Sequence, residues 1–278
     1  MELNWSQNLV YGIISGLTEI LPVSAQAHRL VLRKIFGSHN VPGITLLLIH
    51  IGIFLAVLIS CQTQIQRIRR AKQLARIPKK KRRRPLDLVS LMDYNLLMSM
   101  LLPLLLAFIL CHKVVQYENN IFLVSALLFV NGIILYIPQY LPGSNRDART
   151  ITRFQGLGIG LGAALSALPG ISAIGAAVSV GQALGEDRKY GFRMALLMEL
   201  GILIILIVLD ALTIAEAGMV GFTFSLILKS LLAAAGAFGG TLLGIRAMGR
   251  LAENIGFAIF GYYCWAVAIF TLILALFA

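Results

Sequence analysis

The sequence predicts an all-α integral membrane protein: an inverted-topology repeat with about six transmembrane helices plus two re-entrant broken-helix hairpins. Three observations predict this class: an apolar composition, six long apolar segments, and two apolar segments interrupted by proline. Only 13% of the 278 residues are charged, 58% are hydrophobic, and the mean hydropathy is +0.85. Because a soluble domain has roughly 25% charged residues, we expect much of this surface to face lipid.

Six segments are long and apolar enough to cross a bilayer, whose hydrocarbon core of roughly 30 Å requires about 20 mainly apolar helical residues. The predicted spans are 44–60, 96–111, 121–138, 194–212, 222–245 and 254–277. The fifth span contains four glycines at three- and four-residue spacing, Gly236, Gly239, Gly240 and Gly244. Small residues at this spacing predict close packing against another helix.

Two other apolar regions, 8–36 and 155–183, are interrupted by Pro22 and by Pro169. Each is long enough to enter the membrane and return to the same side. In both, a serine follows the proline closely, and three predicted spans come after the region. This is the layout of an inverted repeat whose broken hairpins meet near the membrane midplane. The predicted repeats are residues 1–154 and 155–278.

The basic residues predict the orientation. Eleven of the 24 Lys and Arg residues lie between Arg67 and Arg84, within the predicted loop 61–95. Basic loops between spans are retained in the cytoplasm, so the first broken hairpin is expected to open to the outer face and the second to the inner face. The same clustering argues against nucleic-acid binding, despite a net charge of +12. Contact with anionic lipid headgroups is the alternative role for this loop.

The first broken region contains polar residues among apolar neighbours: Thr18, Glu19, Ser24, Gln26 and His28. Non-helical backbone at membrane depth must be buried in protein or line a polar cavity, and freed N–H groups at a helix start can bind an anion. An ionisable residue inside a membrane segment indicates function, so Glu19 and His28 are candidate functional residues. Thr18 and Ser24, taken alone, are better explained as helix caps.

Two segments resemble known motifs. Segment 15–28 resembles the first motif of the bacterial undecaprenyl-pyrophosphate phosphatase family, also called the bacitracin-resistance family, which reads Glu-Gly-x-Thr-Glu-Phe-x-Pro-x-Ser-Ser-x-x-His. Segment 169–175 resembles the second motif, Pro-Gly-x-Ser-Arg-Ser-Gly. The order and separation of the motifs and the number of spans extend the resemblance to nearly the whole chain.

The resemblance implies an enzyme that hydrolyses a polyprenyl pyrophosphate at the outer face of the bacterial plasma membrane and recycles undecaprenyl phosphate for cell-wall synthesis. It implies that His28 acts as a general acid or base, and that Glu19 orients it or holds a divalent cation such as Mg²⁺ or Ca²⁺. The implied substrate-binding residues are Thr18, Ser24, Gln26, Gly170, Ser172 and Gly175. A homodimer is compatible with the motifs, which do not specify an oligomeric state.

The chain departs from the motifs at four positions, namely Ser15, Ala25, Ala173 and Ile174. By resemblance, Ala25 replaces the serine nucleophile and Ala173 replaces the arginine that binds phosphate. Alanine can do neither, so this chain is expected to be an inactivated form. The alanines arose either by natural loss or by introduction into an active enzyme, and the retention of Glu19 and His28 favours introduction.

The alternative function is a non-hydrolysing flippase or transporter of polyprenyl phosphate, because inverted repeats with broken helices also suit alternating access. A transporter of small solutes is a third interpretation, but it explains so apolar a site less well. Asn131, Glu199 and Asp210 lie within apolar spans, where hydrogen bonding between helices is the favoured explanation. Glu199 follows the second broken region and is therefore the first of these to test.

Overall fold

The structure is a computed structural model that describes residues 3–38, 41–111, 119–141, 146–147, 149–218, 223–254 and 257–277. Throughout these residues the regular elements are helices, without a β-strand. The six long apolar helices are α3 (Gly43–Ala75), α4 (Leu88–Cys111), α5 (Ile121–Tyr136), α8 (Arg188–Ala217), α9 (Phe224–Asn254) and α10 (Ala258–Phe277). Each has the length and composition to cross a membrane, so the predicted all-α membrane class with six spans is confirmed.

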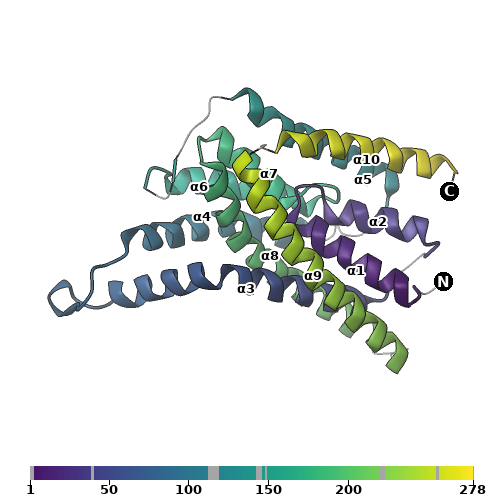
Figure 1. Cartoon of the computed structure of the whole chain (residues 1–278), viewed down its shortest axis with the longest axis horizontal. Coiled ribbons are helices and arrows are strands. Elements are labelled where there is room, and N and C mark those ends of the chain that lie inside the picture. The colour runs from purple at the N-terminus through teal and green to yellow at the C-terminus, as the bar shows by residue number, and fades with distance from the viewer. Residues whose placement is uncertain are drawn as a thin grey trace.

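Shorter helices form the two broken hairpins. The first pairs α1 (Trp5–Ile20) with α2 (Ala25–Ile35), and the second pairs α6 (Arg153–Ala164) with α7 (Ala173–Ala183). Figure 1 shows that α1 and α2 extend toward the end of the molecule where both termini lie, whereas α6 and α7 lie in the other half. The break predicted at each proline is therefore present, and the inverted repeat itself stays a prediction.

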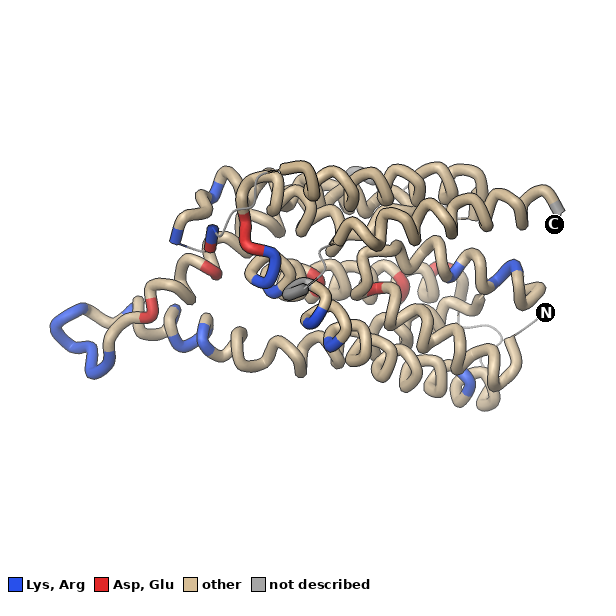
Figure 2. The backbone as a smooth tube through the Cα atoms, turned by 45° about the horizontal axis from the view of Figure 1, so that its top comes forward, with Lys and Arg blue, Asp and Glu red and all other residues tan. Residues whose placement is uncertain are grey.

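The basic connection is shorter than the sequence predicts. Helix α3 continues to Ala75 and α4 begins at Leu88, so residues 76–87 alone connect them, with a single 3-10 turn at Lys79–Lys81. The predicted extent of the loop, 61–95, is wrong because Lys, Arg and Gln are good helix formers and their side chains remain solvated on a helix beyond the bilayer. Figure 2 shows the basic residues gathered at this projecting end.

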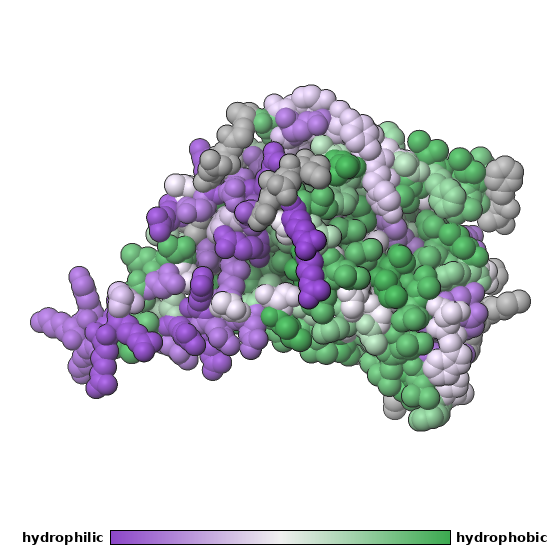
Figure 3. Space-filling view, viewed as in Figure 1, coloured by the Kyte–Doolittle hydropathy of each residue, from purple (hydrophilic) through white to green (hydrophobic). Residues whose placement is uncertain are grey.

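The outer surface of the helical body is apolar. Large side chains on four different spans are exposed, among them Leu55, Leu106, Phe122 and Leu212. In Figure 3 hydrophobic side chains cover much of the visible body, while hydrophilic ones gather at the end with the basic connection. Water-soluble proteins rarely expose so large an apolar area, so this surface is lipid-facing in a multi-pass membrane protein.

Small residues dock each hairpin onto a span of the opposite half. Gly12 and Gly16 of α1 lie directly against the backbone of Ala233 and Ala237 in α9, where a Cβ atom would collide. The Thr241 hydroxyl of α9 donates to the Gly16 carbonyl at 3.1 Å. The close packing predicted for the α9 glycines is confirmed at 236, 240 and 244, whereas a Cβ atom added to Gly239 would meet no atom within 4 Å among the described residues. In the second hairpin, Gly160 of α6 lies in the same way against Met100 of α4.

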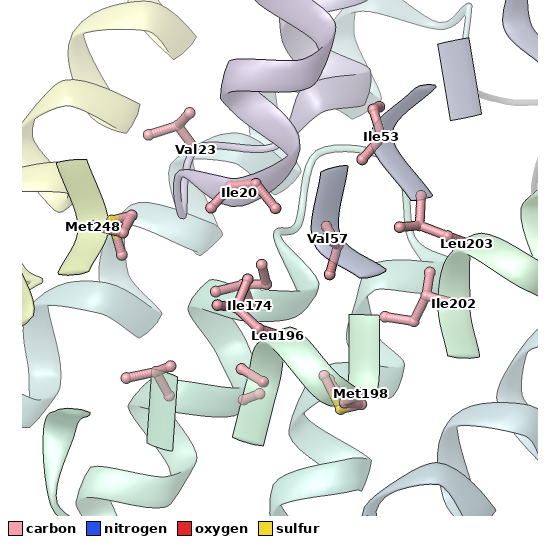
Figure 4. Packing of buried hydrophobic residues seen from close by; sticks show 14 of the residues in the cluster. Ile20, Val23, Ile53, Val57, Ile174, Leu196, Met198, Ile202, Leu203 and Met248 are labelled. Atoms are coloured by element: carbon pink, nitrogen blue, oxygen red, sulfur yellow. The ribbon is translucent and has the colours of Figure 1, made fainter. Parts of the chain in front are cut away.

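The hydrophobic core joins the two halves. Figure 4 shows Ile20, from the first hairpin, close to Val57 of α3 and Ile174 of α7, with Met198 of α8 farther along the same packed region. All four side chains are buried in one cluster. Because lipid is as apolar as this core, close packing rather than exclusion of water stabilises the contact. The packing holds the ends of both hairpins at the centre of the molecule.

Candidate active site

A single amide side chain joins the turns of the two hairpins. Asn131 of α5 is fully buried, and its Nδ2 donates to the Pro22 carbonyl at 3.0 Å. Its Oδ1 accepts from the Ser172 backbone N–H at 2.9 Å. The hydrogen bonding predicted for Asn131 is confirmed, but its partners are the backbones of both motifs. Sequence reasoning missed this bridging position, because nothing in the chain near residue 131 marks which loops it will contact.

A cavity of about 40 Å³, which we call the inner chamber, lies where the two motifs meet. The first motif contributes Thr18, Glu19, Ser24, Ala25 and Gln26, and the second contributes Ser172 and Ala173. The structure thus brings together most of the predicted site residues, including both alanines. Thr18 is not a cap, because its hydroxyl donates to the Ile14 carbonyl of its own helix at 2.6 Å.

Two helices begin at the inner chamber. Ser24 caps α2 by accepting from the Ala27 N–H at 3.4 Å, and Ser172 caps α7 by accepting from the Gly175 N–H at 3.2 Å. Ala25 and Ala173 are the first residues of these helices. The freed N–H groups and the helix dipoles favour an anion at this point. Ser24 has a φ of 62°, which side-chain-bearing residues rarely adopt and which is typical of functional sites.

Three ionisable side chains line the inner chamber: Glu19, Arg29 and Glu199. Arg29 Nη1 lies 3.2 Å from Glu19 Oε2. Glu199 of α8 is only 1% exposed, and its Oε1 has no hydrogen-bond partner in the described part of the chain. Glu199 is outside the predicted site set, although its place after the second broken region drew attention to it. Arg29 was missed, and its spacing of three residues from Gln26 is the signal that could have found it.

A second cavity of about 440 Å³, the outer chamber, adjoins the inner one. The two chambers share Gln26, Arg29, Phe108, Ser166 and Leu206 as lining residues. Polar residues of the outer chamber include Arg33, His50, Asp210 and Glu216, and its apolar residues include Tyr11, Leu46, Leu209 and Leu212. His50 Nδ1 and Asp210 Oδ2 lie 2.6 Å apart, so the predicted inter-helix hydrogen bonding of Asp210 is confirmed.

Several buried polar atoms that lack hydrogen-bond partners belong to residues lining these chambers. Within the described residues they are Gln26 Oε1, Arg33 Nε, His50 Nε2, Ser166 Oγ and Glu199 Oε1. A buried polar atom without a partner costs roughly 1–3 kcal/mol, and proteins leave few of them. Their concentration beside apolar residues fits a ligand with a polar head and an apolar tail.

Three predicted site residues lie outside both chambers. His28 Nδ1 is 2.8 Å from the Ser24 carbonyl, and its Nε2 is 2.9 Å from the Tyr263 hydroxyl, with the two rings stacked. Gly170 has a φ of +115° in the turn before α7, and a Cβ atom on Gly175 would lie 2.9 Å from the Pro22 side chain. These residues shape the site. The catalytic role of His28 stays a prediction.

The residues present do not form a complete site for a divalent cation. Glu19 accepts from Arg29, and Glu199 is the second carboxylate of the inner chamber. Across the described ranges, no group of three or more His, Cys, Asp and Glu side chains gathers. Because Mg²⁺ and Ca²⁺ require about six or more oxygen ligands, the predicted cation at Glu19 stays a prediction.

The fold and the site define a multi-pass membrane protein with a buried polar cavity between two broken hairpins. Residues 8–270 match the family described as bacitracin resistance protein BacA, and the chain belongs to this family. The predicted resemblance is therefore confirmed over nearly the whole chain.

Several relatives are named undecaprenyl-diphosphatase. One from Nocardioides sp. (strain ATCC BAA-499 / JS614) is 32% identical over 196 residues, 70% of each chain. One from Methanococcus maripaludis (strain C7 / ATCC BAA-1331) is 27% identical over 270 residues, 96% of this chain and 98% of the relative. One from Methanobrevibacter smithii is 26% identical over 273 residues, 95% of each chain.

Proposed function

We propose that the two chambers bind the head of undecaprenyl pyrophosphate and that the chain is an undecaprenyl-pyrophosphate phosphatase inactivated at Ala25 and Ala173. The observation that supports this proposal is the convergence of the N-termini of α2 and α7 on one inner chamber. Two helix N-termini favour a multiply charged anion such as a pyrophosphate. The relatives named undecaprenyl-diphosphatase indicate the same ligand.

The outer chamber suits the start of the prenyl chain. Its lining includes the apolar residues Leu46, Leu209 and Leu212 together with the polar residues Arg33 and Thr213. Such a mixed lining matches the point where a charged phosphate joins a hydrocarbon. The pyrophosphate would then lie toward the helix N-termini, with the lipid leaving through the outer chamber.

Hydrolysis adds water across the phosphoanhydride bond and yields polyprenyl phosphate and inorganic phosphate. A serine at position 25 would place its hydroxyl at the start of α2, next to N–H groups that stabilise the charge on phosphoryl oxygens. Ala25 offers no oxygen to attack phosphorus, and the Ser24 hydroxyl already accepts from Ala27. Ala173 brings no positive charge. Together these losses should lower the rate by several orders of magnitude.

The roles of Glu19 and His28 belong to the same proposal. Glu19 lies in the inner chamber and is paired with Arg29. His28 contacts the Ser24 carbonyl, one residue before position 25. This contact supports a role for His28 in holding the turn that presents residue 25.

The proposed setting is a bacterial plasma membrane. Connection 76–87 would lie in the cytoplasm because it is rich in Lys and Arg, and the α1–α2 hairpin, at the opposite end of the molecule (Figure 1), would open to the outer face. A homodimer belongs to the same proposal, and light scattering of the detergent-purified protein would test it.

Restoring the two missing groups tests the phosphatase proposal. The variant A25S/A173R, purified in detergent, should release phosphate from undecaprenyl pyrophosphate, and the parent chain should release none above background. The single variants A25S and A173R are the matched controls and should be far less active, because the two groups act as a set. If the folded double variant releases no phosphate, the phosphatase proposal is wrong.

The second candidate is a flippase or transporter that moves polyprenyl phosphate without hydrolysing it. The inner chamber retains polar side chains such as Glu19 and Gln26 but has Ala25 where a nucleophile is expected. This combination favours the second candidate. Transfer of lipid between leaflets by the parent chain in proteoliposomes would support this candidate. Absence of transfer, together with rescued hydrolysis in A25S/A173R, would eliminate it.

A further inference from the structure

The inner chamber contains an arginine even though the second motif has lost its own. Ala173 presents only a methyl group to this chamber. Arg29 of α2 lines the same chamber and is 9% exposed. A buried guanidinium requires an anionic partner, which Glu19 provides at 3.2 Å. The site therefore holds a positive charge at a position outside the second motif.

Arg29 belongs to a polar stripe along α2. Gln26, Arg29 and Arg33 are three and four residues apart, which places them on one helix face. Gln26 and Arg29 line both chambers, and Arg33 lines the outer one. Arg33 Nε and Gln26 Oε1 are buried without hydrogen-bond partners in the described residues. The stripe therefore leads from the inner to the outer chamber and retains unused hydrogen-bonding capacity.

We propose that Arg29, followed by Arg33, binds the phosphate groups of the ligand in place of the arginine missing at position 173. The inference rests on the proposed binding of a lipid pyrophosphate. Guanidinium groups form paired hydrogen bonds with phosphate oxygens, and the two phosphates of a pyrophosphate are neighbours, as are the two arginines. Glu19 stays paired with Arg29 until the more highly charged phosphate takes the place of the carboxylate. Arg29 and Arg33 would then supply charge for binding, whereas hydrolysis still lacks the groups missing at positions 25 and 173.

Binding measurements with undecaprenyl pyrophosphate in detergent test the inference. R29Q should weaken binding about 10- to 100-fold, the range expected for hydrogen bonds to a charged group. R33Q should weaken it less, and R69Q, at an exposed position near the basic end of α3, should leave it unchanged. Binding of undecaprenol, which has no phosphate, should be the same in all four proteins.

Moving the arginine from position 29 to position 173 makes the test more specific. The variant R29A/A173R should bind undecaprenyl pyrophosphate more tightly than R29A, because it returns an arginine to the same chamber. E19Q/R29Q removes both charges of the ion pair and covers the case in which R29Q alone misfolds. If the parent binds the lipid and E19Q/R29Q binds it equally well, the inference is wrong and the proposed function stands. If the folded parent does not bind the lipid, the proposed function fails first.

Discussion

The two broken hairpins are built alike but contribute different chemistry. In each hairpin the second helix starts at the inner chamber with a serine cap, and the first helix docks through glycines on a span of the other half. The α1–α2 hairpin brings Glu19 and Arg29 to the chambers, whereas the α6–α7 hairpin brings hydroxyl groups and no ionisable side chain. The carboxylate beside the second hairpin, Glu199, belongs to α8.

This difference shows that the framework of the site and its charges are separable. Glycine contacts, serine caps and the Asn131 bridge fix where the helix starts meet, and none of them requires a charge. The proposed replacement of the arginine at position 173 by Arg29 would therefore change the charges and leave this framework in place. The following predictions test the shared framework first and the differences between the hairpins afterwards.

The largest expected effect comes from adding a bulky side chain where α1 packs against α9 and where α6 packs against α4. G16L places a side chain against the Ala237 backbone, and G160L does the same against Met100. Overpacking costs about 1–3 kcal/mol and sometimes more, and backbone cannot move aside as a side chain can. Both variants should lose most of their folded, monodisperse protein in size-exclusion chromatography. G239L, whose position has open space among the described residues, is the matched control and should elute like the parent.

Removing the bridge between the hairpins should have the next largest effect. N131L leaves the Pro22 carbonyl and the Ser172 N–H without their partner, and each unpaired group costs roughly 1–3 kcal/mol. The melting temperature and the affinity for undecaprenyl pyrophosphate should both fall. S125A, on the same helix, removes a hydroxyl bonded within α5. Equal losses in both variants would contradict a bridging role.

Glu186, which follows the second hairpin, should make stability depend on pH. Burial, together with nearby Asp187, raises the pKa of its carboxyl from 4.5 to about 8. The folded state therefore binds a proton that the unfolded chain releases, so stability is greatest below about pH 4.5 and falls as pH rises toward about 8. E186Q should flatten this part of the melting-temperature profile. An unchanged slope in E186Q would assign the pH dependence to other groups.

The smallest effect distinguishes the two serine caps. Ser24 has a φ of 62°, whereas Ser172 has a φ of −91°. Glycine accepts a positive φ, but alanine is strained by roughly 1–2 kcal/mol. S24G should therefore be more stable than S24A, by about 1 kcal/mol beyond the difference between S172G and S172A. Equal differences at the two positions, measured by thermal melting, would remove the argument for strain at Ser24.

Much of the framework could be predicted from the sequence. Apolar length identified the six spans, and the prolines identified both breaks. Helix ends were less predictable. Charged residues continue α3 to Ala75, and a hydropathy pattern detects only the apolar part of such a helix. The site was partly predictable, since motif spacing marked Glu19, Ala25 and Ala173. Arg29 and the bridging role of Asn131 depend on which segments lie opposite one another.

The sequence by itself determined the class, the spans and the positions where the helices break, because apolar length and proline act locally along the chain. The tertiary structure decided which polar groups share a chamber. Asn131 joins two turns from different halves, Glu199 enters from α8, and Arg29 and Ala173 line the same chamber. These relations arise from packing between segments far apart in the chain, and no local pattern encodes such distances.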